Sequence, residues 1–280
     1  MTTTLLPSRV DVTQYAGKDT LVRLIRQEFK DCFDMLVEAG EKEWHAQTPC
    51  ELWEVRDMAG HLLDAAYGYL GYFRQGRHGW PAEEPRGMRA YGDALGISAL
   101  EYRKVYRWEV LGRLDACATL LFDYFDQLTE EQWTAGPVPH AWVGPVPGFM
   151  MAAFQLMDYS VHNWDLRKAL GKDDFVEHEA SDTLVPFMFG LMQITFAPER
   201  AKDVDLTVGI HISTSKNEHW TVRIKDGALT YEPGKPKKPD ASFSYPCNEF
   251  CLDVYQRMHG GTAFGNKKSI KQFRKLFFTI

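Results

Sequence analysis

The chain of 280 residues lacks several features that would place it outside the globular proteins. It has no low-complexity tract, and hydrophobic residues (45%) outnumber charged ones (25%), which excludes a disordered, collagenous or coiled-coil protein. No cationic segment followed by an apolar one opens the chain, so no signal peptide is expected and the expected location is cytoplasmic. At roughly 150 residues per domain, the length suggests two compact units.

Long uncharged runs and paired cysteines are also scarce. The longest stretch without Asp, Glu, Lys or Arg, residues 132–157, could cross a bilayer, but its four prolines exclude a lipid-exposed helix. The five cysteines are odd in number and lack CxxC spacing, which is typical of reduced thiols.

Excess positive charge is absent, since the net charge is −6. This balance argues against a protein that coats nucleic acid. Residues 203–280 carry 12 Lys and Arg against 8 Asp and Glu, so the negative charge lies in the first part. This asymmetry indicates two separately built parts.

Hydrophobic periodicity predicts helices over about 21–36, 55–73, 98–128 and 149–170, with a further helix over about 179–196. From about residue 204 the period changes to two, which predicts four short strands, followed by two helices. The predicted fold is therefore α+β, with an antiparallel four-helix bundle in residues 1–202 and a small α+β domain in residues 203–280.

The fourth predicted helix contains the most informative residues. Asp158 and His162 are four residues apart and share a helix face, and Asp165 lies three residues after His162. Such a pair alone is more often a solvated or hydrogen-bonded face. Here the surrounding residues are apolar, and a buried carboxylate is costly unless it is paired or binds a metal.

A second histidine lies in the second predicted helix. His61 has small or apolar neighbours in the segment AGHLLDAA and is expected to face the bundle interior. A lone histidine there is more often a hydrogen-bonded core residue. Opposite Asp158 and His162, however, it would complete a His/Asp/His site of the kind that catalytic zinc uses.

Two motifs carry a resemblance to a known family. The residues Trp44, Thr48-Pro49-Cys50 and Trp53 through Leu62 resemble the W…TPC-x-GWTVRDLLAHL signature of the mycothiol-dependent maleylpyruvate isomerase family, a branch of the DinB-like metal-binding bundles. The segment Val161–Leu166, with Gly171, is similar to that family's second signature, E-x-x-x-H-x-WDL…G.

The resemblance implies a divalent metal, expected to be zinc, held by His61, Asp158 and His162, and mycothiol as thiol cosubstrate. The chain departs from the family pattern at Asp158, where the family usually has Glu. It also departs at Leu52 and Glu54, where the family usually has Gly and Thr.

The C-terminal part resembles the sterol carrier protein type two fold, which many family members append. The resemblance implies either a lipid-binding cavity or a domain that closes the active-site mouth. Arg223 is the predicted catalytic residue of this part, because it could hold an anionic group.

Three further residues of the first part are assigned roles. Asp165 is predicted as a catalytic residue, either as the partner of a metal-bound histidine or as a bond to the preceding loop. His140 and Trp142 are predicted to bind the cosubstrate or substrate, because they lie in an apolar, proline-rich loop just before the helix of Asp158.

The predicted activity is attack of a thiolate on an electrophilic carbon, either as an isomerase or as a thiol S-transferase. The expected partners are therefore a small-molecule thiol and an electrophilic small molecule, with no nucleic acid and no membrane insertion. Two other classes stay open, a non-enzymatic carrier of a lipid and a metal-dependent hydrolase that uses metal-bound water.

Overall fold

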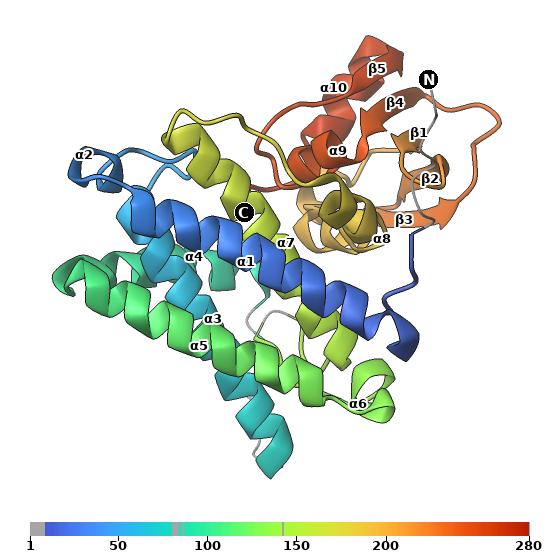
Figure 1. Ribbon diagram of the computed structural model, residues 1–280. Coiled ribbons are helices and arrows are strands. Elements are labelled where there is room, and N and C mark those ends of the chain that lie inside the picture. Colours follow the sequence, from blue (N-terminus) through green and yellow to red (C-terminus); the bar gives the residue numbers. More distant parts are fainter. Residues whose placement is uncertain (1–8, 80–83, 86, 142, 280) are drawn as a thin grey trace, which may run out of the picture. The chain divides into compact units, whose positions relative to one another are not determined.

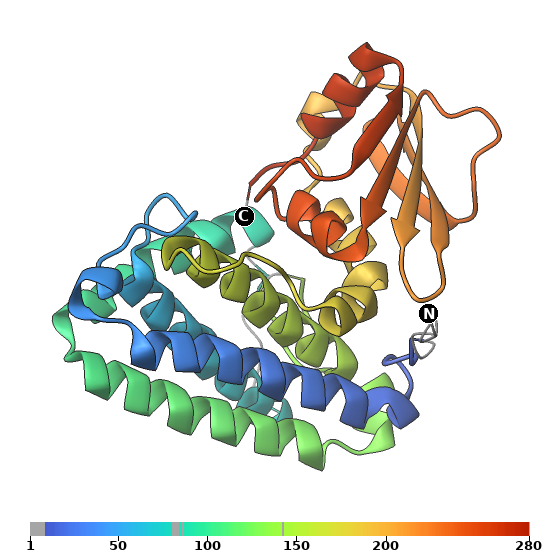
Figure 2. The same ribbon diagram turned by 45° about the horizontal axis from the view of Figure 1, so that its top comes forward.

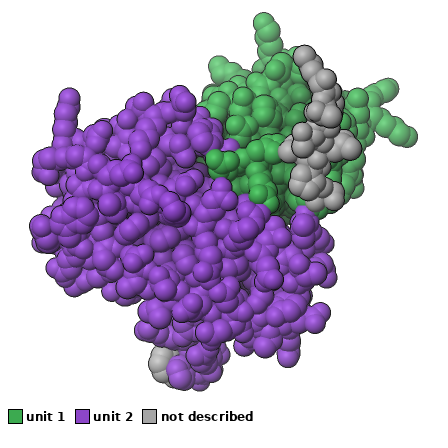
Figure 3. All heavy atoms as spheres, viewed as in Figure 1, with its two compact units in different colours: residues 1–9, 177–280 green, residues 10–176 purple. Residues whose placement is uncertain are grey.

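The computed structural model describes residues 9–79, 84–85, 87–141 and 143–279 (Figure 1). The chain divides into two compact units, residues 10–176 and residues 1–9 with 177–280 (Figure 3). The predicted limits, 1–202 and 203–280, differ from this division. The reason is helix α8 (His178–Thr195), which packs against a helix and a strand that follow it in the chain.

The unit of residues 10–176 is helical. It contains α1 (Lys18–Glu38), α2 (Glu41–Trp44), α3 (Val55–His78), α4 (Met88–Glu101), α5 (Arg107–Gln127), α6 (Glu130–Thr134) and α7 (Gly148–Ala169). Helices α1, α3, α5 and α7 form a four-helix bundle in which α1 and α3 each pack against α5 and α7. Figure 2 shows α1 and α5 side by side.

The four helices run in two opposite directions. Lys18 at the start of α1 donates a hydrogen bond to the carbonyl of Asp126 near the end of α5, so these two helices are antiparallel. Helices α3 and α5 run parallel, since Asp57 near the start of α3 pairs with Arg103 just before α5, and Phe73 contacts Phe125 further along. Helix α4, which lies between them in the chain, packs on α3, and its end meets Gly60 near the start of α3.

The predicted continuous helix over 98–128 is wrong. Helix α4 ends at Glu101, and Val105 is extended (φ −101°, ψ 143°) before α5 begins. The end of α4 packs tightly on α3, because a Cβ added at Gly60 would lie 2.7 Å from the carbonyl oxygen of Ala99. These tertiary contacts break a helix that the periodicity alone would continue.

The other unit is α+β. Its strands are β1 (Leu206–Ser213), β2 (Glu218–Lys225), β3 (Ala228–Pro233), β4 (Ala241–Pro246) and β5 (Thr262–Gly265), and its helices include α8, α9 (Cys247–Val254) and α10 (Lys267–Arg274). The strand order is β3-β2-β1-β4-β5, with β1 and β4 parallel and the other neighbours antiparallel. Asp226 and Gly227 form the tight turn between β2 and β3, and both have the positive φ that such a hairpin turn requires.

The core of this unit explains where α8 belongs. The ring of Phe189 on α8 stacks on Trp220 of β2 at 4.3 Å and also contacts Phe250 of α9. The short strand β5 was not predicted, since its four residues are nearly all exposed and show no alternation of burial. Within the described residues, no helix is long and apolar enough to cross a membrane.

Candidate metal and thiol site

Helix α3 positions His61 through a well-anchored first turn. The backbone N–H of Glu54 donates to Asp57 at 2.8 Å, and Arg103 binds both carboxylate oxygens of Asp57. This carboxylate therefore caps the helix while its charge is neutralised. Two turns along, the buried ring of His61 stacks on Trp53 at 4.5 Å, which fixes its orientation.

Helix α7 carries the facing residues, as their spacing predicted. Oδ1 of Asp158 lies 3.1 Å from Nε2 of His61 and 3.4 Å from Nε2 of His162. The two histidine rings meet edge to face at 4.7 Å. The structure thus brings together, within 4.8 Å of one another, one ligand atom from each of the three residues.

This cluster fits a divalent metal. Two imidazole nitrogens and one carboxylate oxygen are donors that zinc accepts, and three protein ligands leave a position for another group. Oδ2 of Asp158 is buried and, among the described residues, has no hydrogen-bond partner, which is costly for a carboxylate oxygen in a protein with nothing bound. The donor set and this oxygen together make the cluster a candidate metal site.

Charge coupling holds the cluster together. Burial would raise the pKa of the Asp158 carboxyl, but the adjacent rings of His61 and His162 hold this pKa well below its usual range. Burial would likewise lower the pKa of His162, whereas its hydrogen bonds to Asp158 and Asp165 raise it to about 9. Asp158 is therefore available as a carboxylate ligand at neutral pH.

Asp165 contacts the far side of His162. Its Oδ2 lies 2.9 Å from Nδ1 of His162, and the carboxylate is fully buried. This geometry lets the carboxylate orient the ring of His162. The predicted catalytic role of Asp165 remains a prediction.

Cys50 contacts Asp165, which the sequence did not predict. Its thiol donates to the same Oδ2 of Asp165 at 3.4 Å. The only signal was its position in the TPC segment, which reads as a turn.

A family model matches the helical part of this chain. The family model described as mycothiol maleylpyruvate isomerase N-terminal domain matches residues 25–167, about half of the chain, and these include all three clustered residues. The chain belongs to the mycothiol maleylpyruvate isomerase family. No curated protein matches the chain in sequence.

A solved structure has a similar fold over most of the chain. The crystal structure of the mycothiol-dependent maleylpyruvate isomerase is 12% identical, with a TM-score of 0.59, and the match covers 90% of this chain and 93% of that chain. A mutant of that isomerase matches at 11% identity with the same TM-score and coverage. A colibactin self-resistance protein in complex with double-stranded DNA matches 55% of this chain and 94% of its own, at 16% identity and a TM-score of 0.47.

His140 of this family member lies in an aromatic environment. Its buried ring contacts the rings of Tyr69, Tyr72, Tyr91 and Phe154. Burial lowers the pKa of His140 to about 4, so the imidazole is neutral at neutral pH. The predicted role of His140 in binding remains a prediction. The structure adds that the ring is neutral and surrounded by aromatic side chains.

Two other predicted residues are not part of the cluster described above. Trp142 lies outside the described residues. Arg223 lies on β2, half exposed, and forms an ion pair with Glu232 of β3. Its predicted catalytic role remains a prediction.

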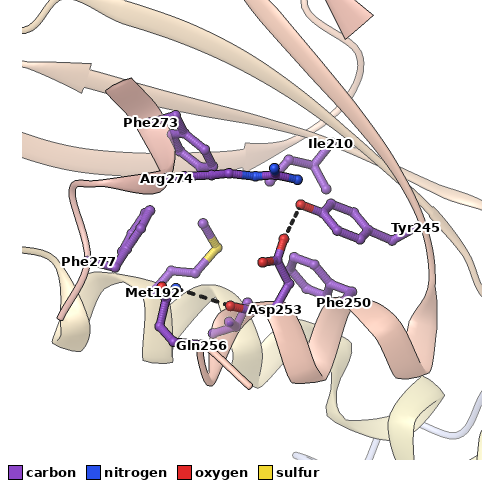
Figure 4. Close-up of a pocket in the computed structure, with 10 residues that line it drawn as sticks. Met192, Ile210, Tyr245, Phe250, Asp253, Gln256, Phe273, Arg274 and Phe277 are labelled. Atoms are coloured by element: carbon purple, nitrogen blue, oxygen red, sulfur yellow. Dashed lines mark hydrogen bonds between the residues drawn. The ribbon is translucent and has the colours of Figure 1, made fainter. Parts of the chain in front are cut away.

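The α+β unit has a cavity of its own, of about 30 Å³. Its lining residues come from α8, β1, β4, α9 and the C-terminal segment, and Figure 4 shows Tyr245 bonded to Asp253 with Arg274 beside them. Ligand pockets for small molecules typically measure ~300–1,000 Å³. The cavity is therefore too small for a sterol or an acyl chain as it stands.

Proposed function

We propose that this protein is a metal-dependent enzyme that uses mycothiol as a thiol cosubstrate to attack an electrophilic carbon. The observation that carries the proposal is the convergence of His61, Asp158 and His162, with Oδ2 of Asp158 buried and lacking a partner among the described residues. Family membership adds the thiol, because the family is described by mycothiol.

A divalent ion bound by these three residues would lower the pKa of a thiol beside it, so that thiolate is present at neutral pH. The protein's own residues prepare the site. Asp165 accepts the Nδ1 proton of His162 and thereby leaves Nε2 as the ligand atom. Trp53 stacks on His61 and restricts rotation of its ring.

Two outcomes of thiolate attack are possible. In an isomerase, the sulfur adds to a carbon–carbon double bond conjugated to a carbonyl, the resulting single bond rotates, and expulsion of the thiolate restores the double bond in trans geometry. In an S-transferase, the sulfur–carbon bond forms as a leaving group departs with its bonding electrons. The aromatic residues around His140 favour an apolar or aromatic electrophile.

The lipid-carrier alternative has less support. It places the function in the α+β unit, whose cavity of about 30 Å³ has room for little more than a few water molecules. The resemblance to a sterol carrier protein remains a prediction, to be checked by native mass spectrometry of the purified protein for co-purified lipid.

The proposal is tested by metal content and thiol dependence together. Protein purified without chelator should contain about one divalent ion per chain, and His61→Ala and His162→Ala should each lose it while staying folded. His45→Ala, at an exposed histidine, is the matched control and should keep the ion. Retention of the ion by both site variants would contradict the metal assignment.

A second experiment assays one electrophile with and without added mycothiol. Mass spectrometry of the product separates the outcomes, since an isomer keeps the substrate mass whereas a thioether contains the thiol. Turnover that needs no thiol would contradict the proposal and favour a hydrolase.

A further inference from the structure

Gln155 on α7 carries a buried side-chain amide. The side chain is 0% exposed, and among the described residues neither its amide nitrogen nor its amide oxygen has a hydrogen-bond partner. More than nine in ten buried polar groups in proteins are hydrogen-bonded, and each exception is costly. This amide therefore needs an explanation other than packing.

Gln155 lies on the same face of α7 as two residues of the metal cluster. Gln155, Asp158 and His162 occur at positions i, i+3 and i+7 of α7, so they share one helix face. The rise per residue puts Gln155 about 4.5 Å along the helix axis from Asp158. A group held by Gln155 would therefore lie next to a group held at the metal.

The facing helix offers room at the same level. Helices α3 and α7 are antiparallel. His61 near the start of α3 contacts Asp158 and His162. Further along α3, Tyr72 contacts the ring of His140, which also contacts Phe154 near the start of α7. The residues of α3 that follow His61 by one and two turns are small, Ala65 and Gly68. Outside its own helix, a Cβ added at Gly68 would have only Oη of Tyr91 within reach, at 4.0 Å.

The two atoms of the amide define the chemistry of the missing partner. The amide nitrogen needs an acceptor and the amide oxygen needs a donor. A carboxylate on the electrophile would satisfy only the nitrogen. The N–H and C=O of a single trans amide point in opposite directions, so one such amide satisfies only one of the two atoms. The N–H and C=O on either side of one extended amino-acid residue point to the same side and can satisfy both. Mycothiol presents its sulfur on a cysteine that is flanked by amide groups, separated from the sulfur only by the short cysteine side chain.

We infer that Gln155 binds the N–H and C=O of the two amide groups that flank the cysteine of the thiol cosubstrate and so positions the sulfur at the metal. This inference rests on the proposed function. It assigns a positioning role to a residue in neither signature motif, and it makes the amides of the thiol a requirement for tight binding.

The experiment compares three thiols on the full-length, zinc-loaded protein by calorimetry. N-acetylcysteamine carries one of the two amides, 2-mercaptoethyl acetate replaces the amide N–H by an ester oxygen, and butane-1-thiol has neither polar group. Gln155→Met keeps the shape of the side chain and removes both polar atoms. Ser160→Ala, another buried polar residue on the opposite side of α7, is the matched control.

Gln155→Met should weaken binding of N-acetylcysteamine about tenfold, the acetate ester less, and butane-1-thiol within about twofold. Equal losses for all three thiols, or no loss for N-acetylcysteamine, would overturn the inference while leaving thiol binding intact. If no thiol binds to the zinc-loaded wild-type protein, the proposed function fails and the inference fails with it.

A second readout uses no ligand. Because Gln155→Met removes two buried polar atoms that have no partner in the described part of the chain, it should raise the thermal midpoint of the metal-free, thiol-free protein by about 2–4 °C. A purely structural glutamine would instead lower the midpoint when replaced, and that result would also overturn the inference.

Discussion

Nδ1 of His162 lies 2.9 Å from Oδ2 of Asp165, on the side of the ring opposite Asp158. Asp165 therefore holds the proton on Nδ1, so a metal would take the place of the Nε2 proton that faces Asp158 in the metal-free protein. We expect Asp165→Asn to weaken zinc affinity by roughly 10- to 100-fold, measured by competition with a chromophoric chelator. An unchanged affinity with a lower thermal midpoint would show that Asp165 is only structural.

Cys50 donates to the same oxygen of Asp165, so its effect on zinc should be smaller than that of Asp165 itself. We expect Cys50→Ser, which keeps a donor, to change zinc affinity less than Cys50→Ala. The same chelator competition measures both variants. A loss of zinc in Cys50→Ser as large as that in His162→Ala would contradict this order and make the sulfur a ligand.

His140 should make stability depend on pH. Its folded-state pKa of about 4 lies below the unfolded value of about 6.5, so the unfolded state binds more protons between these values. The stability from neutral His140 is fully present above about pH 6.5 and is lost as the pH falls to about 4, by up to ~3 kcal/mol. His140→Phe should lose less stability than the wild type between about pH 7 and about pH 4.5. Equal losses in thermal denaturation would contradict the assignment.

The buried carboxylate of Asp57 depends on Arg103. Asp57 is 0% exposed but Arg103 is about one-third exposed, so Arg103→Met, which removes this cation from the carboxylate, should cost about 1.5–3 kcal/mol. Denaturant unfolding measures this loss. Arg113→Met is the control, since Arg113 and Glu109 form a half-exposed pair one helical turn apart, worth about 0.5 kcal/mol or less. Similar losses in both variants would contradict the role given to Asp57.

The division of the chain predicts which fragment folds. Residues 10–176 should fold and bind zinc, because they contain His61, Asp158 and His162 and form a unit of their own. Residues 1–202 should be less soluble, since they keep α8 but lose Trp220 and Phe250, which its Phe189 packs against. Light scattering and metal content of the two fragments check this. A fragment of residues 1–202 that aggregates less than residues 10–176 would contradict it.

Local pattern determined much of this protein. The helical faces around Phe29 and Leu121 and the spacing of Asp158 and His162 follow from the period of the α-helix alone, and the structure has them in α1, α5 and α7. That His61 would face the bundle interior also followed, because its neighbours are small or apolar. Each of these properties depends on residues within a few turns of one another.

Tertiary structure decided the rest, because it depends on residues far apart in the chain. The helical pattern is interrupted before α5 where the backbone at Ala99 packs against Gly60. Helix α8 belongs to the α+β unit because Phe189 stacks on Trp220. Neither contact can be recognised from the hydrophobic periodicity of the local sequence. In the same way, a glutamine in an apolar helix reads as an ordinary residue, and only the packed bundle shows that the amide of Gln155 is enclosed without a partner among the described residues.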